Sequence, residues 1–445
     1  MNLIKLGQGK FVAECTKRFR GTPDVPLITD KNGKAWTAKE LEKLFIKVIG
    51  DMIEQRYGRP LGAALMTVPA NYTTLEREAT INIANESGLK SISLINEPTG
   101  AALAYVEGKS GIFVIVDIGA GTIDVTILET VNGEKVTILA TAGRNDLGGE
   151  ELTTFLVQYV QQKAAEHGIV LNPETDTRDC GLLKLLCEEA KKELSTQNRT
   201  AIATTLKSKF FETEISRNML EKLASPIARS NEELVRTMLE RASIGPEQVD
   251  GVVFAGGGSL SPVVTSGIKA IFKEEQIRQD IDPLHCVAVG AFRALDKKIE
   301  ERIAEGDVFL QANVDRMALP TSPVINEVTG KALGVRVFSQ SRNSEVLGEV
   351  IPACSPVDAE YKATFDLKGC ENNQVEATIA ILEGEAFCAA TDASVLAEYR
   401  MENLPAGPEK DRIEFTYQVD SNGLVNVTAR DTVSGQTISE SVQVG

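Results

Sequence analysis

The sequence of 445 residues has little histidine, little tryptophan and no long apolar run. It contains two histidines, one tryptophan and seven cysteines, none of them in a Cys-x-x-Cys pair. This spacing excludes the common zinc sites, and an odd number of unpaired cysteines favours reduced thiols in a cytoplasmic protein. No segment approaches 18 apolar residues, and the first residues lack the apolar core of a signal peptide, so we expect neither a membrane span nor classical secretion.

The chain also lacks an excess of positive charge. Its formal net charge is −16, which argues against direct binding of nucleic acid or of an anionic membrane as the main activity. Hydrophobic residues make up 42% and charged residues 25% of the chain, as in ordinary globular proteins. The length predicts two or three domains, each with its own core.

The most informative stretch is 112–126, IFVIVDIGAGTIDVT. Its first five residues are apolar and mostly β-branched, which predicts a buried strand, and a second such run follows at 125–128. The connection between them is short and rich in glycine. We therefore predict a hairpin with unobstructed backbone amides in its loop.

The loop of this hairpin has the composition of an anion-binding loop. Gly119, Ala120 and Gly121 allow backbone N–H groups to surround phosphate oxygens. Asp117 and Asp124 would repel a bare phosphate, so they fit this role only with a cation or a polarised water between. The pattern indicates a nucleotide–Mg²⁺ site; the alternative is a tight turn in which the aspartates only stabilise the loop.

Three other segments are candidates for the same site. Glu97 lies between an expected strand at 89–95 and a helix of small residues, where a carboxylate is either a helix cap or a catalytic group. The expected strand 252–255 ends in GGGSLSP, which can present backbone amides to a ligand. The amphipathic helix 182–195 carries Glu188, Lys191 and Ser195 on one face, although for this helix taken alone a solvated face with Glu–Lys pairs is the better explanation.

Seven stretches, in order and with matching spacing, resemble the 70-kDa heat-shock chaperone (DnaK-type) family. They are LMTVPANYTTLEREAT, LINEPTGAALAY, IVDIGAGTIDVTIL, LATAGRNDLGGEEL, CEEAKKELS, VVFAGGGSLSP and DPLHCVAVGA. Nearer the C-terminus, ALGVRV, VEATIAILEGE and DSNGLVNVTARDTVSGQ are similar to the peptide-binding domain of that family.

This resemblance implies an α/β actin-like ATPase (ribonuclease H-like) domain of two lobes followed by an all-β sandwich that binds peptides. We expect the nucleotide-binding domain over residues 1–305, with a mainly helical sublobe at about 152–248. A linker at 306–320 and a substrate-binding sandwich at 321–445 would follow.

The resemblance also implies roles for individual residues, with ATP or ADP and Mg²⁺ as cofactors. The catalytic candidates are Glu97 near the attacking water, Asp117, which would hold Mg²⁺ through water, and Thr122. The residues expected to contact the nucleotide are Gly119, Ala120, Gly121, Glu188, Lys191, Ser195, Gly256, Gly257 and Gly258. Pro69 and Arg77 would relay the nucleotide state to the peptide domain.

The expected peptide-binding residues are all apolar and lie on alternating strands. They are Val335, Phe338, Phe365, Ala377 and Ile379. Alternation shows which side chains share a face of a strand, but both a groove and a sandwich core would produce this pattern.

The sequence departs from the family at several expected contacts. Leu260 and Leu284 stand where the family has an arginine that stacks on adenine and an acidic residue, and leucine replaces neither interaction. The first phosphate loop of the family has no counterpart, Lys5 aligns with the catalytic lysine only across a gap, and the sequence stops before the family's helical lid. We therefore expect weak or absent ATP hydrolysis, either in an atypical member similar to the ribosome-associated branch or in a truncated version of an ordinary chaperone.

Two classes of function remain open from the sequence. The first is an ATP-dependent or ATP-binding chaperone that binds unfolded or nascent polypeptides. The second is a non-enzymatic co-chaperone or scaffold that works with a J-domain protein, with the ribosome as one candidate location. A sugar kinase of the same fold is disfavoured, because the C-terminal region is rich in expected strands.

Overall fold

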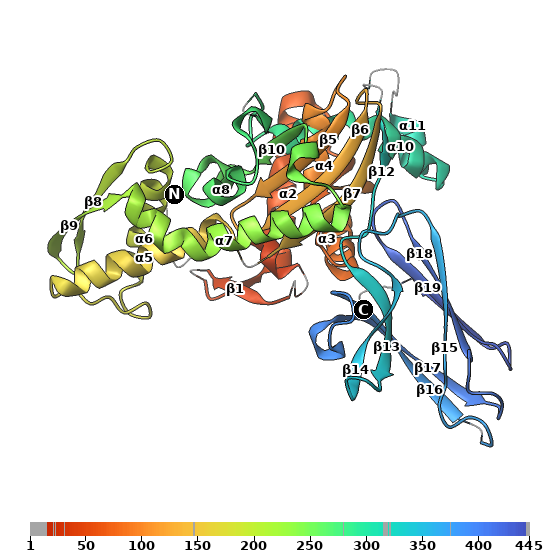
Figure 1. Cartoon of the computed structure of the whole chain (residues 1–445). Helices are drawn as coiled ribbons and strands as arrows, with labels where there is room; N and C mark the ends of the chain where they lie inside the picture. The colour runs from red at the N-terminus through yellow and green to blue at the C-terminus, as the bar shows by residue number, and fades with distance from the viewer. Residues whose placement is uncertain are drawn as a thin grey trace.

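The computed structural model describes residues 16–441 except 21, 23, 31, 146, 279, 315–318, 320, 321 and 374. Figure 1 shows an α/β part, a long helix that leads to a small hairpin at one end, and a β-sandwich at the other end. Within the described residues, no helix is both long and apolar enough to cross a membrane.

The N-terminal part consists of helices around a pair of parallel strands. Its elements are η2 (Thr16–Phe19), β1 (Pro26–Thr29), β2 (Ala35–Thr37), α2 (Ala38–Tyr57), β3 (Ala63–Val68), α3 (Thr74–Glu86), β4 (Ser91–Asn96) and α4 (Glu97–Tyr105). Capping boxes begin α2 and α3, because Thr37 pairs with Glu40 and Thr73 with Glu76. Both boxes have the Thr-x-x-Glu spacing by which a sequence predicts a helix start.

A six-stranded mixed sheet forms the centre of the α/β part. Its order is β11 (Ile277–Arg278), β10 (Gly251–Ala255), β5 (Gly111–Ile118), β6 (Ile123–Val131), β7 (Lys135–Arg144) and β12 (Val324–Asn326). Strands β5 and β6 form the predicted antiparallel hairpin, with Asp117 opposite Asp124. Strand β10 runs parallel to β5, and Ala255 is opposite Asp117. This register brings the ends of both strands to the same edge of the sheet.

Helices cover both faces of this sheet, as the continuous apolar run of β5 requires. Val114 and Val116 point into one core with the helices α5 (Gly149–Glu166), α6 (Thr177–Glu193), α7 (Arg217–Ala242) and α8 (Pro262–Lys269). Phe113 and Ile115 point into a second core with α4 and α9 (Cys286–Arg293). The small residues of α4 do allow close packing: a Cβ atom on Gly290 would lie 1.7 Å from the carbonyl oxygen of Gly100.

The structure adds detail to two of the expected regions. The region expected to be mainly helical contains an antiparallel hairpin of β8 (Arg199–Leu206) and β9 (Lys209–Ser216). The expected linker contains the helix α11 (Val308–Asn313), which follows α10 (Leu295–Ala304). Leu310 of α11 is buried, and the ring of Phe309 lies against Gly62, so tertiary packing holds this segment as a helix. Short 3₁₀ turns occur at η3 (Pro246–Gln248), η4 (Gly257–Leu260), η5 (Glu274–Gln276) and η7 (Ala390–Asp392).

The C-terminal part is a sandwich of two four-stranded antiparallel sheets. One sheet has the order β14 (Ser344–Ile351), β13 (Ala332–Ser339), β16 (Val375–Gly384) and β17 (Ser394–Leu404). The other has the order β15 (Glu360–Phe365), β18 (Ile413–Val419), β19 (Val425–Asp431) and β20 (Thr437–Ser441). Side chains from both sheets, such as Ile381 and Phe415, share one core. The all-β sandwich expected after the α/β domain is therefore present.

Candidate functional site

Three carboxylates meet at the edge of the central sheet. Asp117 and Asp124 lie on neighbouring strands, and Glu97 is the first residue of α4. Asp124 is completely buried, and its Oδ1 accepts a hydrogen bond from the backbone N–H of Ala70 at 3.0 Å. Its Oδ2 is buried without a hydrogen-bond partner among the described residues. A buried carboxylate oxygen of this kind is costly unless a cation or water completes it.

The raised pKa values of two of these carboxylates indicate that a positive charge beside them would be favourable. Burial, and then the negative charge of Glu97, raise the pKa of Asp117 to about 7. The same two causes raise the pKa of Asp124 well above its ordinary value. Lys17 counteracts both shifts and forms an ion pair with Glu97. One lysine therefore faces three acids.

The residues fit a hydrated Mg²⁺ ion better than a directly coordinated metal. Across the residues that the structure describes, no group of three or more His, Cys, Asp or Glu side chains is placed to bind a metal. Mg²⁺ keeps several waters and uses one or two carboxylates together with phosphate oxygens. Asp117 and the unpartnered Oδ2 of Asp124 suit that mode.

Two glycine-containing loops come together beside these acids. Gly256 has a φ of +76°, and a Cβ atom there would lie 2.4 Å from Oδ1 of Asp117. A Cβ atom on Gly258 would lie 2.8 Å from the carbonyl oxygen of Ile118. Only glycine allows these close approaches. The structure therefore brings 256–258 against the loop 119–121, although they are far apart in the sequence.

The hairpin loop is held in place by backbone hydrogen bonds. The N–H of Gly119 donates to the carbonyl of Thr122 at 2.9 Å. The carbonyl of Gly119 accepts from Gly149 at 3.0 Å, and that of Ala120 accepts from Glu150 at 2.7 Å. The loop thus packs against the start of α5, where the helix dipole favours an anion.

The predicted adenosine contacts join α6 to the start of α5. Lys191 Nζ donates to the carbonyl of Gly149 at 2.8 Å and to Thr153 Oγ1 at 2.9 Å, and it forms an ion pair with Glu188. Burial raises the pKa of Glu188, but hydrogen bonds from Lys191 and Thr153 outweigh it, so the pKa is below its ordinary value. Ser195 Oγ donates to the carbonyl of Lys191 at 3.5 Å. These side chains therefore have structural partners, and Lys191 reaches Gly149, which packs against the loop 119–121.

Arg77 connects the carboxylate cluster to the sandwich. This buried side chain donates to the carbonyl of Ala70 at 3.3 Å and to Asn96 Oδ1 at 2.8 Å. Ala70 follows Pro69 and contacts Asp124, while Asn96 precedes Glu97. Both of these bonds come from Nη2, whereas Nη1 donates to the carbonyl of Asn422, in the turn between β18 and β19, at 3.4 Å. A chain of hydrogen bonds therefore runs from Asp124 through Ala70 and Arg77 to the sandwich, and the relay role of Pro69 and Arg77 stays a prediction.

The five predicted peptide-binding residues line one cavity of about 630 Å³ in the sandwich. Val335, Ala377 and Ile379 line it and are buried. Phe365 packs edge-to-face on Phe415, with 5.6 Å between the ring centroids. Phe338 also lines the cavity and is 62% exposed. The three most buried residues belong to the core and also line the cavity, so the groove interpretation stays a prediction beside the core one.

Two contacts of the site were missed by sequence reasoning. Lys17 lies beside Glu97, 80 positions away, whereas the lysine considered from the sequence was Lys5, which lies outside the described residues. Asn422 was also missed; its Oδ1 accepts from the N–H of Leu94 at 2.9 Å. The only sequence signal for Lys17 was the need for a cation near three acids, which does not say where in the sequence the cation lies.

The two leucines that depart from the family pattern lie at the surface. Leu260 is 49% exposed and Leu284 is 61% exposed.

The fold and site together define a class: an α/β domain with converging glycine loops and buried carboxylates, joined to a β-sandwich with an apolar groove. Residues 17–445 match the sequence profile of the family described as Hsp70 protein. The chain belongs to the Hsp70 family, which confirms the resemblance seen in the sequence.

Curated relatives agree with this assignment. The chain is 30% identical over 431 residues to the chaperone protein DnaK of Thermosipho africanus, covering 94% of this chain and 67% of that protein. It is 30% identical over 434 residues to a chaperone protein DnaK of Thermus thermophilus, covering 95% of this chain and 66% of that protein. The chain spans about two thirds of the length of the curated relatives that it matches.

Proposed function

We propose that this chain is a molecular chaperone that binds extended apolar peptides in the sandwich groove and ATP or ADP with Mg²⁺ at the carboxylate cluster. The observation that carries the proposal is the 630 Å³ cavity, because its lining includes all five residues chosen from the sequence. Unfolded or nascent polypeptides in the cytoplasm are the proposed clients.

The groove has the chemistry that an extended apolar segment requires. Its lining is mainly aliphatic and aromatic, and the charged side chains Arg336, Asp366 and Lys368 also contribute to it. Apolar side chains of a bound peptide would displace water from the lining, which supplies most of the binding free energy. Arg336 interacts with Glu345 and Glu398, so its charge is partly balanced.

The test is binding of a fluorescent apolar peptide to the full chain and to folded variants. Ile379→Asp places a charge in the groove and Phe365→Ser removes an aromatic wall, so each should weaken binding at least about tenfold. Val395→Asp is the matched control, because Val395 is an exposed apolar residue of the same sandwich and does not line the groove. Equal binding by wild type and both groove variants would reject the proposal.

We propose in addition that nucleotide turnover is weak. Glu97, the candidate for orienting the attacking water, forms an ion pair with Lys17 through one carboxylate oxygen, so its negative charge is already partly neutralised. Exposed Leu260 and Leu284 offer no charged or planar contact to an adenine base. These features support slow hydrolysis without excluding nucleotide binding.

Isothermal titration with Mg²⁺·ATP and a single-turnover hydrolysis assay test this second proposal. Weak binding and slow turnover are expected, and Glu97→Gln and Thr122→Ala should reduce any turnover that is measurable. Sub-micromolar affinity with rapid turnover would contradict the proposal. An unchanged rate in both variants would remove Glu97 and Thr122 from the site.

The same two leucines favour an alternative function, a co-chaperone or scaffold in which nucleotide, if bound, only maintains the conformation of the protein. In that case a J-domain protein would be the functional partner, and the ribosome a candidate location. Stimulation of turnover by a J-domain protein would favour the chaperone with an ATPase cycle. Binding of the J-domain protein without any change in turnover would favour the scaffold.

A further inference from the structure

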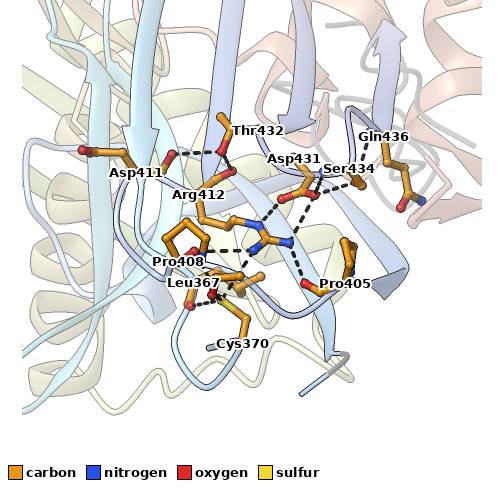
Figure 2. Close-up of polar contacts among 11 residues, drawn as sticks. Leu367, Cys370, Pro405, Pro408, Asp411, Arg412, Asp431, Thr432, Ser434 and Gln436 are labelled. Atoms are coloured by element: carbon orange, nitrogen blue, oxygen red, sulfur yellow. Dashed lines mark hydrogen bonds and ion pairs between the residues drawn. The ribbon is translucent and has the colours of Figure 1, made fainter. Parts of the chain in front are cut away.

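A fully buried ion pair lies beside the peptide groove and has no part in the proposed chemistry. Arg412 and Asp431 are both completely buried, and Arg412 is the largest side chain in the described residues with this degree of burial. Figure 2 shows the guanidinium of Arg412 facing the carboxylate of Asp431. Nε pairs with Oδ1, and Nη2 lies 3.3 Å from Oδ2, so the contact is bidentate.

The remaining donors of Arg412 reach two further segments. Nη2 donates to the carbonyl of Pro405 at 2.9 Å, and Nη1 donates to that of Pro408 at 3.5 Å and to Cys370 Sγ at 3.9 Å. Asp431 in turn accepts hydrogen bonds from the N–H and the hydroxyl of Ser434, the first at 2.7 Å. The pair thus joins the β15–β16, β17–β18 and β19–β20 connections.

Stability alone does not explain such a pair. The cost of desolvating two charges roughly cancels their attraction, and apolar residues of similar volume often stabilise a protein as well or better. A buried pair of this kind does, however, specify geometry, because its donors and acceptors accept only one arrangement.

The segment held by the pair forms one wall of the groove. The backbone N–H of Arg412 donates to the carbonyl of Phe365 at 2.9 Å, and Cys370 Sγ donates to the carbonyl of Leu367 at 3.0 Å. Phe365, Leu367 and Lys368 all line the cavity. The segment 365–370 is therefore attached to Arg412 at both of its ends, to the backbone N–H at Phe365 and to the guanidinium at Cys370, and its middle carries groove side chains.

We infer that Arg412, paired with Asp431, is a positioning residue of the peptide groove: it holds 365–370 so that Phe365 and Leu367 form a fixed wall against the bound peptide. This inference rests on the proposed peptide-binding function. A fixed wall slows peptide release, because a loosened wall must be reordered in each complex, and differences between related complexes appear mainly in the off-rate.

The test uses the full chain with the double substitution Arg412→Met and Asp431→Leu, which removes both charges and leaves none uncompensated. Arg400→Met with Glu376→Leu is the matched control, because this exposed pair lies in the same sandwich and outside the groove. Stopped-flow fluorescence of an apolar peptide measures the on-rate and off-rate separately. Thiol labelling and hydrogen exchange report on 365–370 directly.

The buried double variant should stay folded, release peptide about tenfold faster and keep a similar on-rate. Its Cys370 thiol, buried in the wild type, should become accessible to a thiol reagent, and the amides of Leu367 and Gly369 should exchange faster. The control should match the wild type. Arg412→Lys keeps the charge but cannot form the bidentate contact, so its peptide off-rate should lie between those of the wild type and the buried double variant.

A folded double variant with wild-type release and wild-type Cys370 labelling overturns the inference and leaves the proposed function standing. Absence of peptide binding by the wild type itself overturns the proposed function, and the inference with it. The two failures are therefore distinguishable.

Discussion

Two aspartates of this chain are equally buried and have opposite surroundings. Asp124, in the carboxylate cluster, and Asp431, in the sandwich, are both 0% exposed. Oδ2 of Asp124 has no partner among the described residues, and burial and neighbouring acids raise its pKa. Burial also raises the pKa of Asp431, but hydrogen bonds from Arg412 and Ser434 outweigh it and leave the pKa below its ordinary value.

The contrast separates a candidate binding site from a structural site. A fully compensated charge has no further need of a partner, so Asp431 can only organise its surroundings. An uncompensated buried charge is unstable by itself and gains most from a cation. The acids around Asp124 therefore have the properties of a ligand site, and the predictions below test this difference.

The largest expected effect is from breaking the compensated pair. Arg412→Ala leaves Asp431 buried without its partner and should destabilise the sandwich by about 3–5 kcal/mol. Hydrogen exchange of the β18 and β19 amides, followed by mass spectrometry across a urea series, measures the sandwich separately from the α/β part. If Arg412→Ala is no less stable than the double variant without either charge, the pair is not compensated as described.

The next effect is a dependence of stability on pH, with opposite signs at the two sites. The pKa of Asp117 is raised from 3.8 to about 7, so its favourable contribution is complete below about pH 4 and is lost as the pH rises to about 7. The lowered pKa of Asp431 has the opposite effect. Its contribution to the stability of the sandwich is present at pH values above the ordinary aspartate pKa of 3.8 and is lost as the pH falls further.

Trp36 allows the α/β part to be followed alone, because it is the only tryptophan of the chain. Urea unfolding detected by its fluorescence should show stability decreasing between about pH 5 and about pH 7 without Mg²⁺. Asp117→Asn should flatten this dependence. A wild-type stability that rises over the same range would contradict the uncompensated cluster.

A smaller effect of the opposite sign is expected from Asp124→Asn. The amide keeps an oxygen that can accept from Ala70 and removes a buried negative charge, so the α/β part should gain about 1 kcal/mol at about pH 7.5 without Mg²⁺. Affinity for Mg²⁺·ATP should fall in the same variant. Loss of stability without nucleotide would show that Asp124 is already compensated.

The smallest effect is expected from the exposed pair of Arg400 and Glu376. Both side chains remain more than half exposed, so water and salt screen their interaction. Arg400→Met should leave the urea midpoint of the sandwich unchanged, as measured by the same hydrogen-exchange series. A clear loss of stability would mean that burial is not what separates this pair from Arg412 and Asp431.

The sequence alone determined the parts of the fold that depend on neighbouring residues. Apolar β-branched runs around a glycine loop predicted the β5–β6 hairpin that carries Asp117 and Asp124. Thr37 and Glu40 predicted the start of α2, because a capping box needs only four consecutive positions. Alternation along strands, together with family resemblance, selected Val335 and Ile379 for the groove.

Local sequence signals failed to predict the β8–β9 hairpin, whose turn lacks the usual turn residues, and helix α11, which packs against distant residues. Lys207 and Ser208 form the β8–β9 turn with positive φ angles of 48° and 63°, where glycine or asparagine normally marks a hairpin. Helix α11 lies in the expected linker: Asp307 caps its start, and the packing of Phe309 and Leu310 holds it against the rest of the chain.

Only the tertiary structure decided which distant charges meet. Lys17 reaches Glu97 across 80 positions, Arg77 reaches Asn422 across 345, and Arg412 reaches Asp431 across 19 from another strand. A long charged side chain carries no periodic signal, since its partner is set by how sheets and helices pack. The sequence therefore determined the strands, caps and glycine loops, and packing determined that one buried aspartate keeps an unpartnered oxygen while the other is neutralised.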